Sequence, residues 1–362
     1  MKLKKIICAI LPTVILSACG GDNTAVFTES AEDGITVLSA EVSDKITQLE
    51  SGLTAVKYED DYKFAEFLES GGADTDMGVI KYISENLLSG ADYLGFIGKN
   101  FGCSTLSVKN ADGGYLFGRN FDWDKCNAMI VQTDPPDGYA SIATVNTDFI
   151  SMSGMSVSKM PDNILALAGI YAPLDGMNEK GLCVSVNMIS DSENTNQNTD
   201  KPDITTTTAV RLLLDKAENT EKAIALLEQY DFHTSMGMTV HFAIADNSGK
   251  SVCVEYLNDK MIVTETPIVT NFYFAEGDKN GIGTQQSHER YDILTTLLSE
   301  NNTLDMNGMK DALDSVSKDN FNEFESTEWS IVFNQQTGEA RYFHREDYTK
   351  CYKFNLETEA ET

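Results

Sequence analysis

Positive charge is scarce in this 362-residue sequence, which has 27 Lys and Arg against 56 Asp and Glu and a net charge of -29 at pH 7. Nucleic-acid binding depends on clustered Lys and Arg that neutralise phosphates, so this balance argues against a nucleic-acid partner. It also argues against adhesion to anionic lipid headgroups. The acidity is typical of a protein whose own charge keeps it soluble.

Metal-binding patterns are also missing from the sequence. The seven cysteines form no CxxC pair, and the four histidines lack metal-ligand spacing, so we expect no metal or other cofactor. Cys183 and Cys253 lie in apolar, strand-like runs and are expected to be core residues. A disulfide among Cys126, Cys183, Cys253 and Cys351 stays open.

Long apolar runs are absent beyond the N-terminal segment. Three lysines among the first five residues precede the run Ile6–Leu16, which is too short to span a membrane and typical of a signal peptide. It ends in Leu16-Ser17-Ala18-Cys19, which resembles a bacterial lipobox. The resemblance implies removal of residues 1–18, a lipid on Cys19, and an extracytoplasmic lipoprotein held at a membrane of the cell envelope. An ordinary signal peptide with an incidental cysteine is the alternative.

Residues 19–102 form an acidic leader with 16 Asp and Glu against five Lys, a net charge of -11. Its apolar residues recur at steps of three and four, which is typical of amphipathic helices. A break at Gly71-Gly72-Ala73 separates the two periodic stretches, so we expect two or three helices. The periodic residues are Val42, Ile46, Leu49, Leu53 and Val56, then Val79, Ile80, Ile83, Leu87 and Leu88.

Residues 103–362 have a different pattern, in which strands dominate and helices are inserted. These 260 residues are enough for one domain with a full core. The expected helices span 208–216, 221–230 and about 304–316, and the expected strand pairs are 238–246 with 251–256 and 329–334 with 340–344.

Cys103 opens the most informative pattern, because Arg119 and Asp122 follow it after 16 and 19 positions. Two β-rich runs, 104–108 and 115–120, flank an Asn/Asp/Gly cluster, which predicts a hairpin. The hairpin would bring the three side chains together. A thiol beside a guanidinium and a carboxylate is typical of a reactive nucleophile.

The register of this hairpin can be predicted from its turn. If Val108 pairs with Tyr115, Cys103 lies opposite Asn120. Arg119 and Asp122 would then bracket the sulfur.

The spacing and the segment Gly118-Arg119-Asn120-Phe121-Asp122 resemble the choloylglycine hydrolase family. This family of N-terminal-nucleophile (Ntn) amidases includes bile salt hydrolases and penicillin V acylases. The segment from Asp175 to Leu182, Asp-Gly-Met-Asn-Glu-Lys-Gly-Leu, resembles the family's second signature. The resemblance implies an α+β fold: an αββα Ntn sandwich over 103–362, with 19–102 as a helical propeptide.

The resemblance also implies the roles of individual residues. Cys103 would be the nucleophile, with Arg119 and Asp122 beside it. Asn187 would help form an oxyanion hole, although a polar residue ending a strand is the alternative. Two further matches follow, in Ile268-Val269-Thr270-Asn271 and Ser287-His288-Glu289-Arg290-Tyr291. They assign Asn271 and Arg290 to the site, with an ordinary surface-helix arginine as the alternative for Arg290.

An N-terminal cysteine needs no histidine, because its free α-amine, with a pKa of about 8, can act as the base. Asp122 could hold that amine, and the Arg119 charge would favour the thiolate. Cys103 becomes N-terminal only if the bond after Gly102 is cut. A glycine there would let the thiol attack its own upstream carbonyl. The alternative is a relative in which the bond stays intact.

The implied reaction is hydrolysis of a linear amide carbon–nitrogen bond through a thioester, with a small N-acyl amide as substrate. Bile salts, penicillin V and other N-acyl amides are all open, and we favour a general hydrolase of amides with apolar acyl groups. A non-catalytic, ligand-binding lipoprotein on the same scaffold is the alternative from another class. The oligomeric state stays open, a homo-oligomer included.

Cleavage after Gly102 would leave the lipid on the leader alone. Because both pieces are acidic, we expect at least part of the catalytic chain to be released from the membrane.

Overall fold

The computed structural model of the protein describes residues 14–16, 25, 27–88, 94–96, 102–152, 160–191, 193–318 and 325–356. The predicted anchor residue Cys19 and most of the predicted signal peptide lie outside these residues. Within the described ranges, no helix has both the length and the apolar character needed to cross a membrane.

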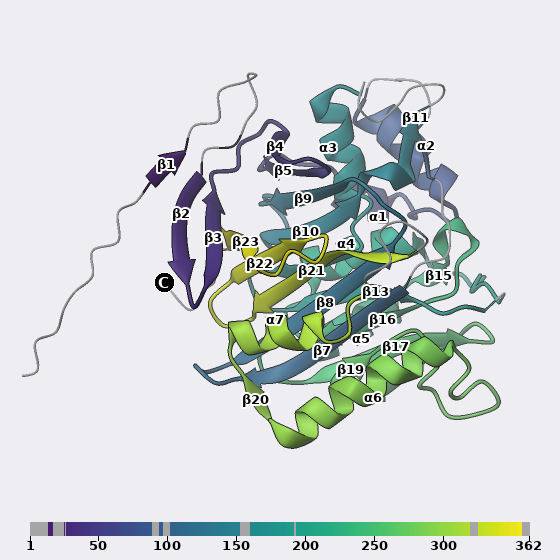
Figure 1. The fold of residues 1–362 in the computed structure, drawn as a ribbon. Coiled ribbons are helices and arrows are strands. Elements are labelled where there is room, and N and C mark those ends of the chain that lie inside the picture. The colour runs from purple at the N-terminus through teal and green to yellow at the C-terminus, as the bar shows by residue number, and fades with distance from the viewer. Residues whose placement is uncertain are drawn as a thin grey trace, which may run out of the picture.

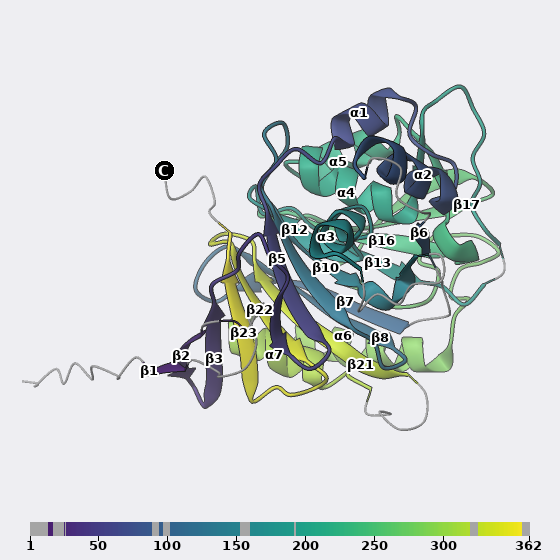
Figure 2. The ribbon, with the colours of Figure 1, turned by 90° about the horizontal axis from the view of Figure 1, so that it is seen from above.

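Two large sheets lie face to face (Figures 1 and 2). In spatial order, the first contains β1 (Val14–Leu16), β2 (Phe27–Glu32), β3 (Ile35–Ala40), β23 (Lys350–Asn355), β22 (Glu339–His344), β21 (Ser326–Asn334), β8 (Tyr115–Trp123), β7 (Gly102–Asn110) and β19 (Ile268–Val269), with β20 (Thr303–Leu304) also paired to β7. The second contains β18 (Lys260–Glu265), β17 (Ser251–Leu257), β16 (Val240–Ala245), β13 (Cys183–Met188), β12 (Asp175–Asn178), β10 (Ser141–Asn146), β9 (Ala128–Thr133), β5 (Leu53–Tyr58) and β4 (Thr47–Glu50). Two small sheets join β6 (Leu94–Phe96) to β11 (Ile150–Met152) and β14 (Asp203–Thr205) to β15 (Asp231–His233).

Helices cover the outer faces of both large sheets (Figure 2). On the first sheet, α6 (Gln285–Glu300) contacts β7 and β19, and α7 (Met306–Asp314) contacts β8 and β21. On the second, α3 (Asp162–Ile170), α4 (Thr206–Lys216) and α5 (Thr220–Leu227) contact β9, β13 and β16 respectively. This layering is the predicted αββα sandwich.

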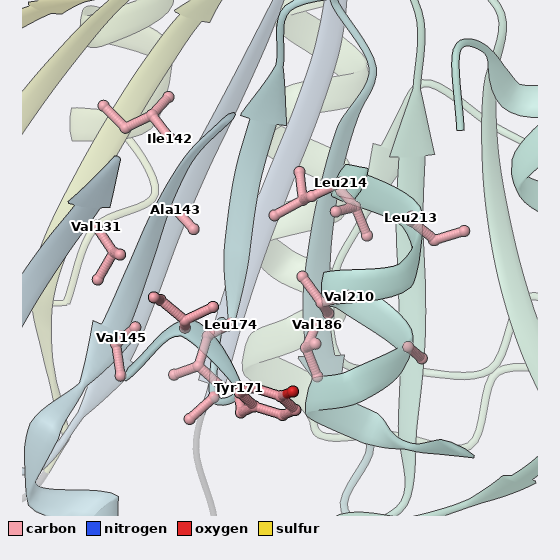
Figure 3. Close-up of a cluster of buried hydrophobic side chains, with 14 of the residues drawn as sticks. Val131, Ile142, Ala143, Val145, Tyr171, Leu174, Val186, Val210, Leu213 and Leu214 are labelled. Carbon is pink, nitrogen blue, oxygen red and sulfur yellow. The ribbon is translucent and has the colours of Figure 1, made fainter. Parts of the chain in front are cut away.

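The main core continues from the sheets to the helix layer over β9, β10 and β13. Figure 3 shows Val210 and Leu214 of α4 directed towards strand side chains that include Ile142 and Val186. A Cβ at Gly176 would lie 2.9 Å from Leu214 Cδ1 and 2.6 Å from the Ile142 carbonyl oxygen. Gly176, the first glycine of the second signature, therefore allows α4 to pack closely on the sheet.

The elements predicted beyond Cys103 are confirmed. Helices α4, α5 and α7 and the strand pairs β16–β17 and β21–β22 all lie where the sequence places them. Asn219 caps α5 by accepting a hydrogen bond from the Lys222 N–H.

The prediction of a wholly helical leader is wrong. Helices α1 (Phe64–Glu69) and α2 (Asp76–Asn86) form on either side of the Gly-rich break, but residues 42–56 contain strands β4 and β5. Their apolar spacing also fits two strands, because every second residue is buried from Thr47 to Leu49 and from Leu53 to Ala55. Gly52 joins the strands at φ +87°, a left-handed conformation that would interrupt a helix.

The leader strands belong to the same sheets as the remainder of the chain. Strand β3 pairs in parallel with β23, and β5 pairs in parallel with β9. Two cross-segment ion pairs lie near these junctions: Glu32 with Arg341 at 2.7 Å, and Glu50 with Lys350 at 2.7 Å. Residues 27–58 are therefore structural strands of the sandwich.

Candidate active site

The predicted hairpin is strands β7 and β8, but its register differs by one residue from the prediction. Lys109 pairs with Tyr115, so Cys103 lies opposite Phe121 rather than Asn120. The turn is tighter than the prediction assumed, because the Asn110 N–H donates to the Gly114 carbonyl and closes the hairpin one step further along.

This register separates the predicted residues between the two faces of the sheet. Paired residues of an antiparallel ladder point to the same face, and side chains alternate along each strand. The pairs Cys103–Phe121 and Thr105–Arg119 therefore share one face, whereas Asp122, opposite Gly102, points to the other. Only Arg119 of the predicted pair lies beside the sulfur.

Arg119 lies on the sulfur side, and both it and Cys103 have no exposed surface. Its Nη2 donates to Cys103 Sγ at 3.2 Å and to the Val186 carbonyl at 2.8 Å. The thiol donates to the same carbonyl at 3.6 Å. Arg119 thus links the nucleophile candidate on the first sheet to β13 of the second.

Burial is the largest influence on the Cys103 thiol and raises its pKa above the ordinary value. The charge of Arg119 lowers the pKa, that of Asp122 raises it, and that of Arg290 lowers it. The net direction is upward, which favours the thiol over the thiolate in the uncut chain. The predicted influence of Arg119 is present but outweighed.

The main chain of Cys103 is held by Asn271 and Arg290. The Cys103 N–H donates to Asn271 Oδ1 at 2.8 Å, and Arg290 Nη2 donates to the same oxygen at 2.8 Å. Arg290 Nη1 donates to the Cys103 carbonyl at 2.8 Å. Because two donors meet one oxygen, the orientation of the Asn271 amide is fixed.

Arg290 lies on α6 but is buried, at 4% exposure, which excludes the surface-helix alternative. Its Nη1 also donates to Ser104 Oγ at 2.6 Å and to Asp122 Oδ2 at 3.0 Å. Asp122 receives a further hydrogen bond on Oδ1 from the Thr327 hydroxyl, at 2.7 Å. Lys318 Nζ lies 3.7 Å from Asp122 Oδ2. Asp122 is thus a buried carboxylate between two cations.

Asn187 is the expected oxyanion donor and Asn271 another expected site residue, but both amide groups already have carbonyl partners. Asn271 Nδ2 donates to the Met188 carbonyl at 2.6 Å, and Asn187 Nδ2 donates to the Val269 carbonyl at 3.2 Å. Asn187 lies on β13, next to the Val186 carbonyl that contacts the sulfur. In the uncut chain these amides brace the strands around Cys103.

The segment that contains Cys103, Arg119, Asn187 and Asn271 is similar in sequence to known proteins. A family model for linear amide C–N hydrolases, choloylglycine hydrolase family, matches residues 103–272. Over these residues the chain is similar to the choloylglycine hydrolase family. Penicillin V acylase of Pectobacterium atrosepticum is 28% identical over 105 residues, which are 26% of this chain and 28% of the acylase. The match therefore spans less than a third of the length of that relative.

Solved structures with a similar fold match the chain over a longer stretch. A mutant of the conjugated bile acid hydrolase of Clostridium perfringens has a TM-score of 0.54 at 18% identity, covering 70% of this chain and 92% of that chain. A second variant of the same hydrolase has a TM-score of 0.53 at 17% identity, with the same coverage. These likenesses support the sandwich fold.

Two residues that hold the site are not predicted by the sequence patterns. Asp175, the first residue of the second signature, accepts from Arg119 Nη1 at 2.7 Å and from Trp329 Nε1 at 3.0 Å. The acidic residue at the start of that signature could have indicated a buried ion-pair partner for Arg119. Lys318 adjoins Asp122 from the other face, but it lies in no recognisable pattern.

Asn178 of the second signature holds a turn. Its Oδ1 accepts from the N–H groups of Lys180 and Leu182, at 3.1 Å each, and its Nδ2 donates to two carbonyls at the end of α4. The signature therefore combines one ion-pair residue with a rigid connection between β12 and β13.

The five cysteines within the described ranges are free and buried. Cys253 contacts His241 Nδ1 at 3.3 Å, and Glu255 Oε1 lies 3.2 Å from the same nitrogen. These three side chains have atoms within 4.8 Å of one another and could hold a metal ion. Linear spacing did not reveal them, because the pairing of β16 with β17 brings them together.

Proposed function

We propose that this protein is an N-terminal-cysteine amidohydrolase that cuts itself between Gly102 and Cys103 and then hydrolyses linear N-acyl amides. One observation carries the proposal: separate residues hold three atoms of Cys103. Arg119 contacts the sulfur at 3.2 Å, Asn271 accepts from the N–H at 2.8 Å, and Arg290 donates to the carbonyl at 2.8 Å. Such fixed orientation is what an intramolecular attack requires.

The proposed self-cleavage uses one water molecule. Cys103 Sγ attacks the Gly102 carbonyl carbon, the bond from that carbon to the Cys103 nitrogen breaks, and the thiol proton goes to the departing amine. Water then attacks the thioester: one of its protons restores the thiol, the Gly102 carboxylate is released, and the remaining proton passes to solvent. Asn271 Oδ1, already an acceptor from the Cys103 N–H, can retain the new amine in place.

The same groups support turnover of a substrate amide. The free α-amine takes the thiol proton as sulfur attacks the substrate carbonyl and then gives a proton to the leaving amine. Water hydrolyses the thioester. The amine again accepts a proton from the attacking water and returns it to the sulfur. Arg119 stabilises negative charge on sulfur, while Arg290 and Asp122 fix the main chain that carries the amine.

For the substrate, we propose an amide with an apolar acyl group. The partial identity to a penicillin V acylase supports testing penicillin V first. Tauro- and glyco-conjugated bile salts are the second candidates, since the fold is that of a conjugated bile acid hydrolase. Fatty-acyl amino acids and acyl-homoserine lactones complete the panel.

The location of the protein remains the one its first residues suggest: an extracytoplasmic lipoprotein anchored through Cys19. The pairing of β3 with β23 and of β5 with β9 argues for retention of the catalytic chain after cleavage, in place of release. The leader would then be a bound, lipid-carrying subunit.

Intact mass and hydrolysis together test the proposal. Protein that starts after Cys19 should separate into chains ending at Gly102 and beginning at Cys103, whereas Cys103→Ala should stay full length. The same fragment from Cys103→Ala would mean that another protease makes the cut. A full-length wild type that hydrolyses nothing in the panel would favour the ligand-binding alternative.

A further inference from the structure

Lys318 is a buried cation close to Gly102, the residue before the proposed cut. It has no role in the proposed attack or hydrolysis steps. Its side chain is 4% exposed. A Cβ at Gly102 would lie 2.7 Å from Lys318 Nζ. With a carbon–carbon bond of about 1.5 Å, the ammonium is within about 4 Å of the Gly102 Cα.

The main chain around Lys318 is fixed to the site. The Lys318 N–H donates to Thr327 Oγ1 at 2.8 Å, and the Thr327 N–H donates to the Lys318 carbonyl at 3.0 Å. The same Thr327 hydroxyl donates to Asp122 Oδ1. Lys318 is therefore positioned by the residue that orients Asp122.

The charges around Gly102 balance before cleavage. Asp122 lies between Arg290 and Lys318, and Glu325 forms a close ion pair with Lys318. Cleavage adds a carboxylate on Gly102, a residue next to Asp122, since a Cβ at Gly102 would lie 3.1 Å from Asp122 Oδ2. Two neighbouring carboxylates in a buried site repel each other unless a cation lies close to both.

We infer that Lys318 forms a binding site for the carboxylate that self-cleavage creates on Gly102. This inference rests on the proposed cleavage and goes beyond it, because it assigns the leader's new C-terminus a fixed place in the mature enzyme. It also explains why position 102 is glycine: any side chain would occupy the space between the ammonium and Asp122.

Carboxypeptidase trimming tests the site, because only a free and accessible C-terminus is digested. Cleaved wild type and Lys318→Met are incubated with carboxypeptidase Y, and the leader mass is followed with time. We expect the wild-type leader to lose Gly102 slowly and the Lys318→Met leader to be trimmed at least about tenfold faster, as for loss of a charge-assisted bond. Lys318→Arg, which keeps the charge, should be trimmed more slowly than Lys318→Met.

Two controls accompany the digestion. Trimming of the C-terminal chain in the same tube measures protease activity. Lys250→Met, which removes a lysine paired with Glu221 at 3.0 Å on the distant β16–β17 hairpin, should behave as wild type.

Equal trimming in wild type and Lys318→Met would overturn the inference and leave the proposed function standing. A wild type that never separates into two chains would overturn both. If Lys318→Met is not cleaved, Glu325→Gln provides a second test. Glu325 competes with the Gly102 carboxylate for Lys318, so its removal should strengthen binding of that carboxylate and slow trimming roughly threefold or more. An unchanged rate in Glu325→Gln would overturn the inference.

Discussion

Arg119 and Asp175 form a fully buried ion pair that joins the two sheets, with Nη1 2.7 Å from Oδ2 and no exposed surface on either side chain. Arg119 reaches the Cys103 sulfur from this anchored position. Asp175 therefore controls the residue that contacts the nucleophile candidate, although it does not touch the sulfur itself.

Asp175→Asn should weaken both the fold and self-cleavage. Loss of one partner of a buried pair leaves Arg119 uncompensated, which costs about 3–5 kcal/mol. Urea unfolding of uncleaved protein in the Cys103→Ala background measures the stability, and intact mass measures cleavage. Glu179→Gln, in the partly exposed turn of the same signature, is the matched control and should change neither. A stable, fully cleaved Asp175→Asn would contradict this role.

Asp122→Asn should slow cleavage and hydrolysis, because two buried cations, Arg290 and Lys318, lose the anion between them. We expect a loss of roughly a hundredfold, in the range seen when a group that assists proton transfer is disturbed. Asp112→Asn changes an exposed residue in the turn of the same hairpin and should leave the rates intact. Wild-type rates in Asp122→Asn would remove Asp122 from the mechanism.

Cys103→Ser should retain partial function. A hydroxyl can occupy the nucleophile position, but its pKa is higher and its nucleophilicity weaker, so cleavage should slow roughly tenfold or more. The measurement is the time course of chain separation at neutral pH. A rate equal to wild type would show that attack by the side chain does not limit cleavage.

Glu50 makes the leader's attachment sensitive to acid. Burial raises the pKa of Glu50, but hydrogen bonds and charge from His344 and Lys350 outweigh it and hold the pKa at about 2, below the ordinary 4.5. A lowered folded-state pKa stabilises the fold above the unfolded-state value, so this contribution is complete above about pH 5 and disappears between pH 4.5 and 2.

The stability difference between wild type and Glu50→Gln should follow that window. Because Glu50 is partly exposed and screened by solvent, we expect only about 1 kcal/mol at pH 6. Thermal unfolding at pH 6, 4 and 3 measures the difference, which should shrink as the pH falls. A difference that grows on acidification would contradict the assignment.

The cleaved leader should stay with the catalytic chain. Two inter-strand ladders and the ion pair between Glu32 and Arg341 hold it, and its buried Leu53 and Ile80 belong to the main core. Gel filtration and native mass spectrometry of cleaved protein should give one species that contains both chains. Separate elution of the chains would restore the expectation of release.

The local features of this protein were predictable from its sequence, and the distant ones were not. The β7–β8 hairpin, the helices after Thr206 and the grouping of Arg119 near Cys103 follow from turn residues, periodicity and spacing. The hairpin register was not predictable, because one residue more or less in the turn moves every side chain to the other face. The predicted register therefore placed Asp122 beside the sulfur, whereas the Asp122 side chain lies on the opposite face of the sheet.

Long-range pairing accounts for the remaining differences. The apolar spacing of β4 and β5 fits either helix or strand, and strands form because β9 offers β5 a partner, which the leader sequence alone does not reveal. Lys318 and Thr327 meet Asp122 only through the pairing of β21 with β8. A lysine without a surrounding pattern gives no sign of such a position.

The interleaving of leader strands with both sheets changes how the protein can be assembled. Before the cut, the chain folds as one molecule, and the leader's local concentration near β9 and β23 is in the millimolar range that a covalent connection provides. If the proposed cut occurs, recovery from unfolding becomes a bimolecular reaction whose rate depends on how much leader is present. The mature enzyme would then regain activity poorly from dilute denaturant, while the uncut Cys103→Ala chain would refold independently of its concentration.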